Sequence, residues 1–410
     1  MTTKTGKAFY LAAGPLFLIL FIDGMGLGLV FPVLNALIIN PSQSFLSPAT
    51  THIMRNFIFG SIISIFMFCW FFGAAFLGDL SDIIGRKKSL MICLLGASLG
   101  YVLSLLGTLF SSVGLLIFGR VIAGFTSGSQ SIAQAAIVDI STSEKKSQHI
   151  GLILLSSSLG FIVGPLIGGF LSDKEIVSWF SFSTPFCFAA IMSLLNAALL
   201  HLLFHETFVQ TKKMTIQWHH AIRIFTSAFT NKHVKELSVI FLIMMFGWSS
   251  FYSFISMFLY TRYDFSPLRI SAFMALMGLG FGIGTGVIIN YCTAHFTLKK
   301  IIVVSLLLTA LAGFIIVITH HAIYAWSLVT PLVAALAVAY SAIITLFSNQ
   351  VDADSQGWIM GITGAIMAFA FGITGLLVST IADLNPDMPL IISAVSLTIS
   401  ALLLAVWYRK

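Results

Sequence analysis

Twelve long apolar segments follow one another along the 410 residues of this chain. A helix needs about 20 consecutive, mostly apolar residues to cross the hydrocarbon core of a bilayer, and each segment is about that long. The segments are 9–34, 56–77, 89–110, 114–139, 149–172, 184–204, 236–260, 269–291, 300–319, 322–347, 358–380 and 388–408. The pattern predicts an all-α membrane protein with twelve transmembrane helices.

The composition excludes several classes of protein. Only 9% of the residues are charged and 58% are hydrophobic, whereas about 25% of the residues of a soluble domain are charged. The net charge of +7 does not indicate nucleic-acid binding, because basic loops are what orient a membrane protein. We find no phosphate loop, nucleophile triad or metal-ligand spacing, and the four cysteines lie in apolar segments. The sequence therefore predicts no enzyme, no catalytic residues, no metal and no cofactor.

The basic residues predict the orientation of the chain in the membrane. With the N-terminus inside, sixteen of the 21 lysines and arginines fall in cytoplasmic segments and four fall in outer loops. Cytoplasmic loops of membrane proteins carry the excess of basic residues. We therefore expect an integral, multi-pass protein of a bacterial inner membrane with both termini in the cytoplasm.

The longest polar interval divides the chain into two halves of six spans. We expect an N-terminal six-helix bundle at 1–204, a cytoplasmic linker at 205–235 and a C-terminal six-helix bundle at 236–410. The linker is either partly helical at the membrane surface or an unstructured tether. Corresponding loops of the two halves, GDLSDIIGRKK and NYCTAHFTLKK, end in the same Lys-Lys pair. Such pseudo-symmetric halves are typical of transporters that bind substrate near the midplane.

Two charged residues lie well inside predicted spans, Asp23 in the first and Arg120 in the fourth. A charge at the centre of a bilayer costs roughly 2.5–3.5 kcal/mol even on the most lenient scales. Such residues usually pair with each other or face a water-filled cavity, and they mark ion and substrate pathways. A direct ion pair between the two is one alternative; purely structural hydrogen bonding to neighbouring helices is another.

Several motifs resemble those of the major facilitator superfamily, and of its twelve-span drug:proton antiporters, which include the tetracycline and multidrug exporters. The loop after the second span resembles the superfamily signature through Gly78, Leu80, Asp82, Gly85, Arg86 and Lys87. The first span resembles that of the antiporters through Asp23, Gly24, Gly26, Gly28 and Pro32. The fourth span resembles a superfamily motif through Arg120, Gly124 and Gly128. The fifth resembles the antiporter motif through Gly160, Gly164, Pro165, Gly168 and Gly169.

The resemblance implies roles for these residues. Asp82 would meet the cytoplasmic start of span 11 and Arg86 would pair with Asp139, so that together they latch the cytoplasmic side shut. The alternative is that they only orient the loop. The glycine ridge of span 5 would pack against span 8. Asp23 and Arg120 would support proton coupling, because burial favours the neutral carboxyl and a nearby guanidinium favours the ion.

A substrate cavity is expected from polar and aromatic residues of the central spans. The candidates are Asn35, Ser127, Gln130, Gln134, Asn196, Trp248, Phe251 and Tyr252. The resulting prediction is a monomeric, proton-coupled secondary transporter that exports a small amphipathic drug or metabolite by alternating access. The partners are then that small molecule, protons and the lipid bilayer. An importer or facilitator of a metabolite such as an amino acid or siderophore, a lipid flippase and a nontransporting sensor stay open as alternatives.

Overall fold

The computed structural model describes residues 6–141, 146–206, 219–352, 356–382 and 384–408, and the regular structure of these residues is helical throughout. The chain divides into two compact units. Unit 1 comprises Met1–Val30 and Phe68–His220, and unit 2 comprises Phe31–Met67 and Ala221–Lys410. The sequence-based domain bounds, with their linker at 205–235, stay a prediction.

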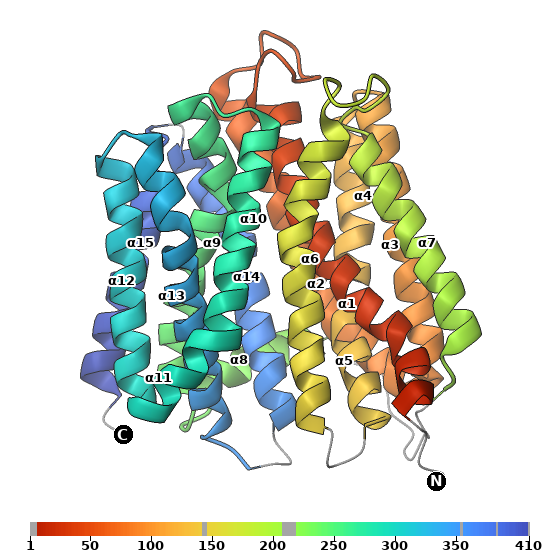
Figure 1. The fold of residues 1–410 in the computed structure, drawn as a ribbon, viewed down its shortest axis with the longest axis vertical. Coiled ribbons are helices and arrows are strands. Elements are labelled where there is room, and N and C mark those ends of the chain that lie inside the picture. Colours follow the sequence, from red (N-terminus) through yellow and green to blue (C-terminus); the bar gives the residue numbers. More distant parts are fainter. Residues whose placement is uncertain (1–5, 142–145, 207–218, 353–355, 383, 409–410) are drawn as a thin grey trace. The chain divides into compact units, whose positions relative to one another are not determined.

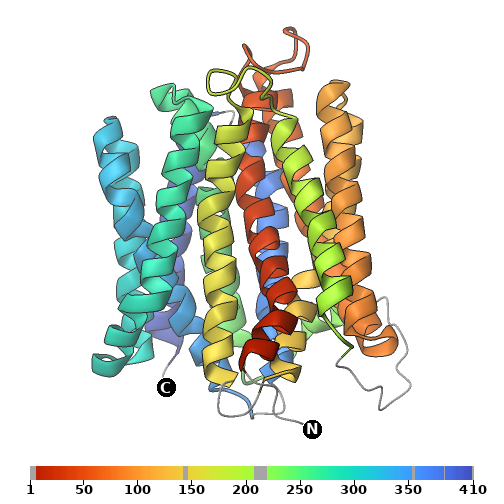
Figure 2. The ribbon, with the colours of Figure 1, turned by 45° about the vertical axis from the view of Figure 1, so that its right-hand side comes forward.

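Unit 1 holds most of the N-terminal helices. They are most of α1 (Gly6–Leu34), the second part of α2 (His52–Ile84), α3 (Arg86–Leu109), α4 (Val113–Thr126), α5 (Ser129–Asp139), α6 (Lys146–Ser172) and α7 (Thr184–Leu203). In Figure 2, α3 (orange) lies beside α7 (yellow-green). The core of the unit joins leucines of α1 and α3 to Ile132 and Ala136 of α5 and Leu200 of α7. This core supports the helices that carry Asp23 and Arg120.

Unit 2 holds the C-terminal helices and residues 31–67, where α1 and α2 are connected. Its elements after α1 are the π-helix η1 (Asn35–Ile39), the first part of α2, α8 (His220–Thr230), α9 (Lys235–Tyr263), α10 (Pro267–Ile283), the π-helix η2 (Gly284–Ile288), α11 (Ile289–His295), α12 (Leu298–Ile318), α13 (Ala322–Ser348), α14 (Gln356–Ala382) and α15 (Met388–Trp407). Figure 1 shows α12 packed between α13 and α15. Phe241, Leu306, Phe347 and Leu397 belong to the core of the unit.

Eleven helices of the described chain are long and apolar enough to cross a membrane, and they correspond to eleven of the twelve predicted spans. The fourth predicted span, 114–139, is present as two shorter helices, α4 and α5, separated by a turn at Ser127 and Gly128. The Ser127 hydroxyl donates to the carbonyl of Ala123, and Ser-Gly sequences are common sites of helix kinks. A Cβ atom at position 128 would lie 2.8 Å from the Gly73 carbonyl oxygen, so glycine lets this turn approach α2.

The predicted linker contains a helix. Residues 207–218 lie outside the described part of the chain, but α8 follows them and packs within unit 2. Its Phe225 ring lies 4.5 Å from that of Phe369. The indole of Trp358 donates a 3.1 Å hydrogen bond to the Ser227 hydroxyl. The interpretation of a partly helical linker therefore describes residues 220–230 better than an unstructured tether does.

Candidate functional site

Asp23 lies in α1, and its carboxylate accepts a hydrogen bond of 2.7 Å from the Ser129 hydroxyl. Ser129 is the first residue of α5, directly after the turn that divides the fourth span, and is 3% exposed. In membrane transporters, interrupted helices commonly build the sites for substrates and coupling ions. The intramembrane carboxylate and the interruption therefore meet at one point of unit 1.

Arg120 is buried in α4 and is 3% exposed. Its Nη2 lies 3.4 Å from the Ser104 hydroxyl of α3. The guanidinium carbon lies 5.4 Å from the centre of the Tyr101 ring and 5.6 Å from that of Phe186. Aromatic faces attract cations at such distances. The structure thus places this cation among α3, α4 and α7.

Tyr101 connects the surroundings of the two charges. Its ring faces Arg120, and its hydroxyl presses on α1 at Gly26, where a methyl group would overlap it. Gly26 is three residues from Asp23, so it lies about one helical turn along α1. Tyr101 therefore contacts Arg120 with its ring and the α1 turn next to Asp23 with its hydroxyl.

The glycine ridge of the fifth predicted span packs against α1. Added Cβ atoms at Gly164 and Gly168 of α6 would lie 2.5 Å from the carbonyl oxygens of Met25 and Leu29. Gly160 is as closely approached by Phe21. The Pro165 ring packs directly on Gly28, where a Cβ atom would lie 2.5 Å from its Cδ. Gly169 is buried next to Gly168. The ridge brings two backbones together next to Asp23; its expected contact with span 8 would join the two units and stays a prediction.

The loop between α2 and α3 brings three of the predicted charged residues together. Arg86 lies 2.6 Å from Asp82, measured from Nη1 to Oδ1, and 3.5 Å from Asp139, measured from Nε to Oδ2. The ion pair with Asp139 connects the start of α3 to the end of α5. The space around Gly78 is open among the described residues. The approach of Asp82 to the start of α14 would cross between the units and stays a prediction.

Glu206 completes this loop, and the sequence analysis did not identify it. Its two carboxylate oxygens accept from the backbone amides of Arg86 and Lys87, at 2.9 and 3.1 Å. These amides begin α3, where the helix dipole favours an anion. Gly85 precedes them with φ of 99°, and a side chain there would be strained and would strike Glu206. The motif therefore needs glycine at position 85, because the Glu206 carboxylate bound by the next two amides leaves no room for a side chain.

The predicted cavity residues separate into three groups. Ser127, Gln130 and Gln134 lie at or after the turn between α4 and α5 and are half-buried. Asn196 of α7 is fully buried and donates to the Pro15 carbonyl of α1, so it links two helices of unit 1. The other four, in unit 2, are Asn35, Trp248, Phe251 and Tyr252.

The three aromatic candidates form one cluster within unit 2. Trp248 stacks on Phe251 with ring centres 5.9 Å apart and contacts Tyr252 at 5.5 Å. Tyr252 meets Phe31 of α1 edge-on at 5.0 Å and Phe371 of α14 at 6.2 Å. Trp248 and Tyr252 are half-buried. This cluster can offer flat, polarisable surface to an apolar molecule.

Comparison with known proteins gives one family for most of the chain. Residues 16–375 match the model of the Major Facilitator Superfamily. The chain is 27% identical to the class C tetracycline resistance protein of Escherichia coli, over 88% of this chain and 86% of that protein. It is 23% identical to multidrug resistance protein 2 of Bacillus subtilis, over 95% and 94% of the two chains.

Solved structures share the fold at lower sequence identity. A D-xylose-proton symporter superposes with a TM-score of 0.76 at 16% identity, over 97% of both chains. The human organic anion transporter MFSD10 gives a TM-score of 0.70 at 18% identity, over 97% of this chain and 99% of that one. These likenesses extend over the full set of helices and concern the fold alone.

Proposed function

Since this chain belongs to the Major Facilitator Superfamily, whose members carry small molecules across membranes, we propose that it exports a small amphipathic compound in exchange for protons. Two relatives that align with most of its length are named for resistance to tetracycline or to several drugs. Resistance of that kind fits removal of a compound from the cell. We propose a bacterial inner membrane as the location, with both termini in the cytoplasm and the monomer as the transporting form.

The hydrogen bond between Asp23 and Ser129 is the observation that carries the proton-coupling part of the proposal. A carboxylate ion is expensive in an apolar interior. The protonated carboxyl suits a closed, dry environment, and the ion suits one opened to water. A shift of α5 relative to α1 would break the hydrogen bond and change which form is favoured. Arg120, the other charged residue within these spans, lies over the Tyr101 ring, and a positive charge that comes near the carboxyl favours its ion.

The central spans provide both hydrogen-bonding and aromatic residues for a substrate. Ser127, Gln130 and Gln134 offer hydrogen bonds next to the turn that carries Ser129. Trp248 and Tyr252 offer aromatic surface, and the buried Phe251 stacks against Trp248. An amphipathic molecule uses both kinds of contact, since its apolar part stacks on rings and its polar part bonds to amides and hydroxyls.

The test uses everted membrane vesicles whose interior is made acidic by respiration. Tetracycline and ethidium are the first probes. An exporter that exchanges drug for protons accumulates the probe in these vesicles, because protons leave as the probe enters. We expect Asp23→Asn to abolish this accumulation while exchange of probe between equal concentrations, which needs no gradient, largely survives. Asn keeps the shape of the side chain and its acceptor for Ser129 but cannot ionise.

Asp173→Asn is the matched control, since this outer-loop carboxylate only accepts from the Glu175 amide. It should accumulate the probes as the wild type does. Uphill transport by Asp23→Asn at the wild-type rate would remove Asp23 from coupling. Accumulation only in right-side-out vesicles with an acidic exterior would show a symporter and overturn the export direction.

A further inference from the structure

A cavity of about 230 Å³ lies at one end of unit 2, and all of its lining residues belong to that unit. Its wall combines the segment that follows the first span with the turn between α9 and α10. Both segments are outer loops in the orientation that the basic residues predict. In that orientation the cavity opens on the outer side of the membrane, and Asp23 is not among its lining residues.

Asn35 gives this cavity a buried polar group without a partner. It is 2% exposed, and its side-chain oxygen lacks a hydrogen-bond donor within the described chain. It begins the π-helix η1, in which the backbone amide of Asn40 bonds back to the Asn35 carbonyl at 3.1 Å. Buried polar atoms nearly always have partners, and π-helical turns often occur at functional sites. Asn35 is one of the lining residues of the cavity, and its covered, unpartnered amide oxygen is the acceptor nearest to hand for a ligand that enters there.

Asp264 lines the same cavity and places a negative charge at its solvent-exposed rim. Its backbone is left-handed, with φ of 51°, as it ends α9. Among the described ion pairs, none includes Asp264. The nearby Arg262 does not neutralise it, because Arg262 Nη1 binds both oxygens of Asp387, at 2.9 and 3.1 Å.

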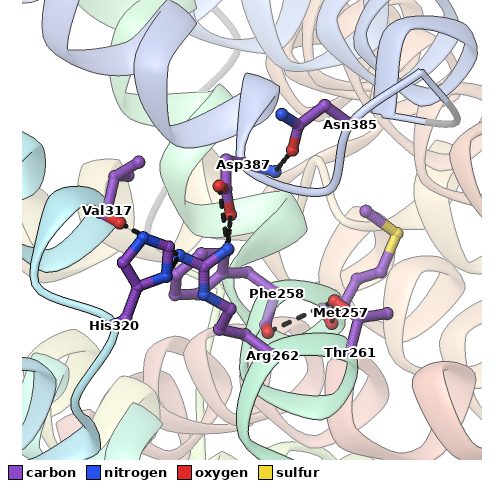
Figure 3. A network of polar contacts seen from close by, with 8 residues as sticks. All are labelled: Met257, Phe258, Thr261, Arg262, Val317, His320, Asn385 and Asp387. Carbon is purple, nitrogen blue, oxygen red and sulfur yellow. Dashed lines mark hydrogen bonds and ion pairs between the residues drawn. The ribbon is translucent and has the colours of Figure 1, made fainter.

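Figure 3 shows the hydrogen bonds that the Arg262 guanidinium makes. Besides Asp387, its Nη2 donates to the Val317 carbonyl at 3.3 Å and contacts the His320 ring. Asp387 is itself 9% exposed, and its backbone amide donates to Asn385. This network fixes the end of α9 to the neighbouring helices. It leaves the Asp264 carboxylate as the charge that the cavity presents.

The remaining walls are mostly apolar, with polar groups on Asn40, Gln43, Tyr260 and Ser266. Tyr260, Phe265, Pro267 and Ile270 line the cavity, and Phe265 is held by stacking on Trp326 at 5.7 Å. The amide groups of Asn40 and Gln43 bond to each other and to Ser42. The charged group and the buried, unpartnered oxygen of the wall, on Asp264 and Asn35, are both acceptors, and aromatic and aliphatic side chains line the cavity with them. A ligand that matches them carries N–H donors, a positive charge and a compact apolar body.

We propose that this outer cavity binds a protonated amine on a small apolar or aromatic body. The Asp264 carboxylate and the Asn35 amide oxygen accept the N–H bonds of the ammonium, and the rings enclose the apolar part. This site is separate from the coupling carboxylate and does not depend on the direction of transport or on proton coupling.

The experiment measures binding of radiolabelled (2-phenylethyl)ammonium to the purified full-length protein in lipid nanodiscs. Asp264→Asn should weaken binding about tenfold or more, since hydrogen bonds to charged groups are the strong ones. Asparagine tolerates the left-handed backbone of this position. Asn35→Leu, which removes the acceptor at similar size, should also weaken binding. Glu175→Gln, an exposed outer-loop charge of unit 1, should bind as the wild type does.

Two further probes separate the contributions to recognition. Neutral 2-phenylethanol should bind much more weakly than the amine, and phenyltrimethylammonium, which is charged but has no N–H, should fall between them. Equal affinity for the amine and the alcohol would overturn the proposal. So would unchanged amine binding in both Asp264→Asn and Asn35→Leu, with melting temperatures showing that the variants are folded.

Discussion

At the scale of single residues, the contact of Asp23 with Ser129 joins positions that are 106 residues apart. The cost of a buried carboxylate made Asp23 conspicuous in the sequence. Ser129 gave no such signal, because it is one of several serines around the turn between α4 and α5. Tyr101 was equally hidden among the aromatic residues of an apolar span. Only the packing of α1 against α3 and α5 distinguishes these two side chains from their neighbours.

We predict that Ser129→Ala lowers proton-driven accumulation about tenfold and leaves gradient-free exchange close to wild type. The loss of a hydrogen bond to a charged group costs about 1.5–3 kcal/mol, which supports a change of that size. The matched control is Ser131→Ala in the same helix, whose exposed side chain donates only to the Gly128 carbonyl. Equal loss in both variants would mean that α5 itself is damaged and that the bond to Asp23 has no special role.

At the scale of elements, the glycine ridge of α6 determines how near α1 can come. A membrane lacks a hydrophobic driving force between helices, so close backbone packing of small residues replaces it. Gly160, Gly164 and Gly168 follow at intervals of four and so lie on one face. The sequence predicted such a face from this spacing. The structure adds that α1 packs on it, while the contact with span 8 that the resemblance implies stays a prediction.

We predict that Gly164→Ala destabilises the protein by about 1–3 kcal/mol, the usual cost of overpacking. The added methyl group would lie 2.5 Å from the Met25 carbonyl oxygen, and a backbone atom cannot rotate aside. Thermal unfolding of the purified protein in detergent measures the change. Gly14→Ala in α1 is the control, since no atom of the described chain lies within 4 Å of its Cβ. A stability of Gly164→Ala equal to that of Gly14→Ala would contradict the packing argument.

At the scale of the whole molecule, fold and function are determined by different observations. The fold is shared with proteins named as a symporter and as an organic anion transporter, over 97% of this chain in each case. The direction of transport therefore cannot follow from the fold. It is proposed from the relatives named for drug resistance and from the Asp23 site. The orientation in the membrane depends on the basic residues alone.

Labelling tests that orientation. In a variant without Cys69, Cys93, Cys187 and Cys292, we expect cysteines at the exposed positions Ser42 and Lys232 to react from opposite sides. A membrane-impermeant maleimide should label Ser42→Cys in intact cells and Lys232→Cys only in everted vesicles. Labelling of both from one side would invalidate the predicted topology and move the amine cavity to the other face.

The sequence by itself determined the apolar spans, the family motifs, the buried charge at Asp23 and the arginine of the loop between α2 and α3. Each of these is a local property, because span length, motif spacing and the cost of a buried charge depend only on residues within one span or loop. The pairing of Arg86 with Asp139 was also predicted, through the resemblance, and the structure contains it.

Only the tertiary structure decided which faces of the helices meet. Lipid-facing and core-facing residues are both apolar here, as the exposed Leu99, Phe118 and Leu202 illustrate, so periodicity does not reveal the buried face as it does in a soluble helix. The partners Ser129, Tyr101 and Glu206, and the outer cavity with Asn35 and Asp264, depend on helix rotation and on contacts between segments far apart in the chain. Because nearly all residues of a span are apolar, the sequence does not determine how each helix is rotated about its axis. Close packing of the helices determines it.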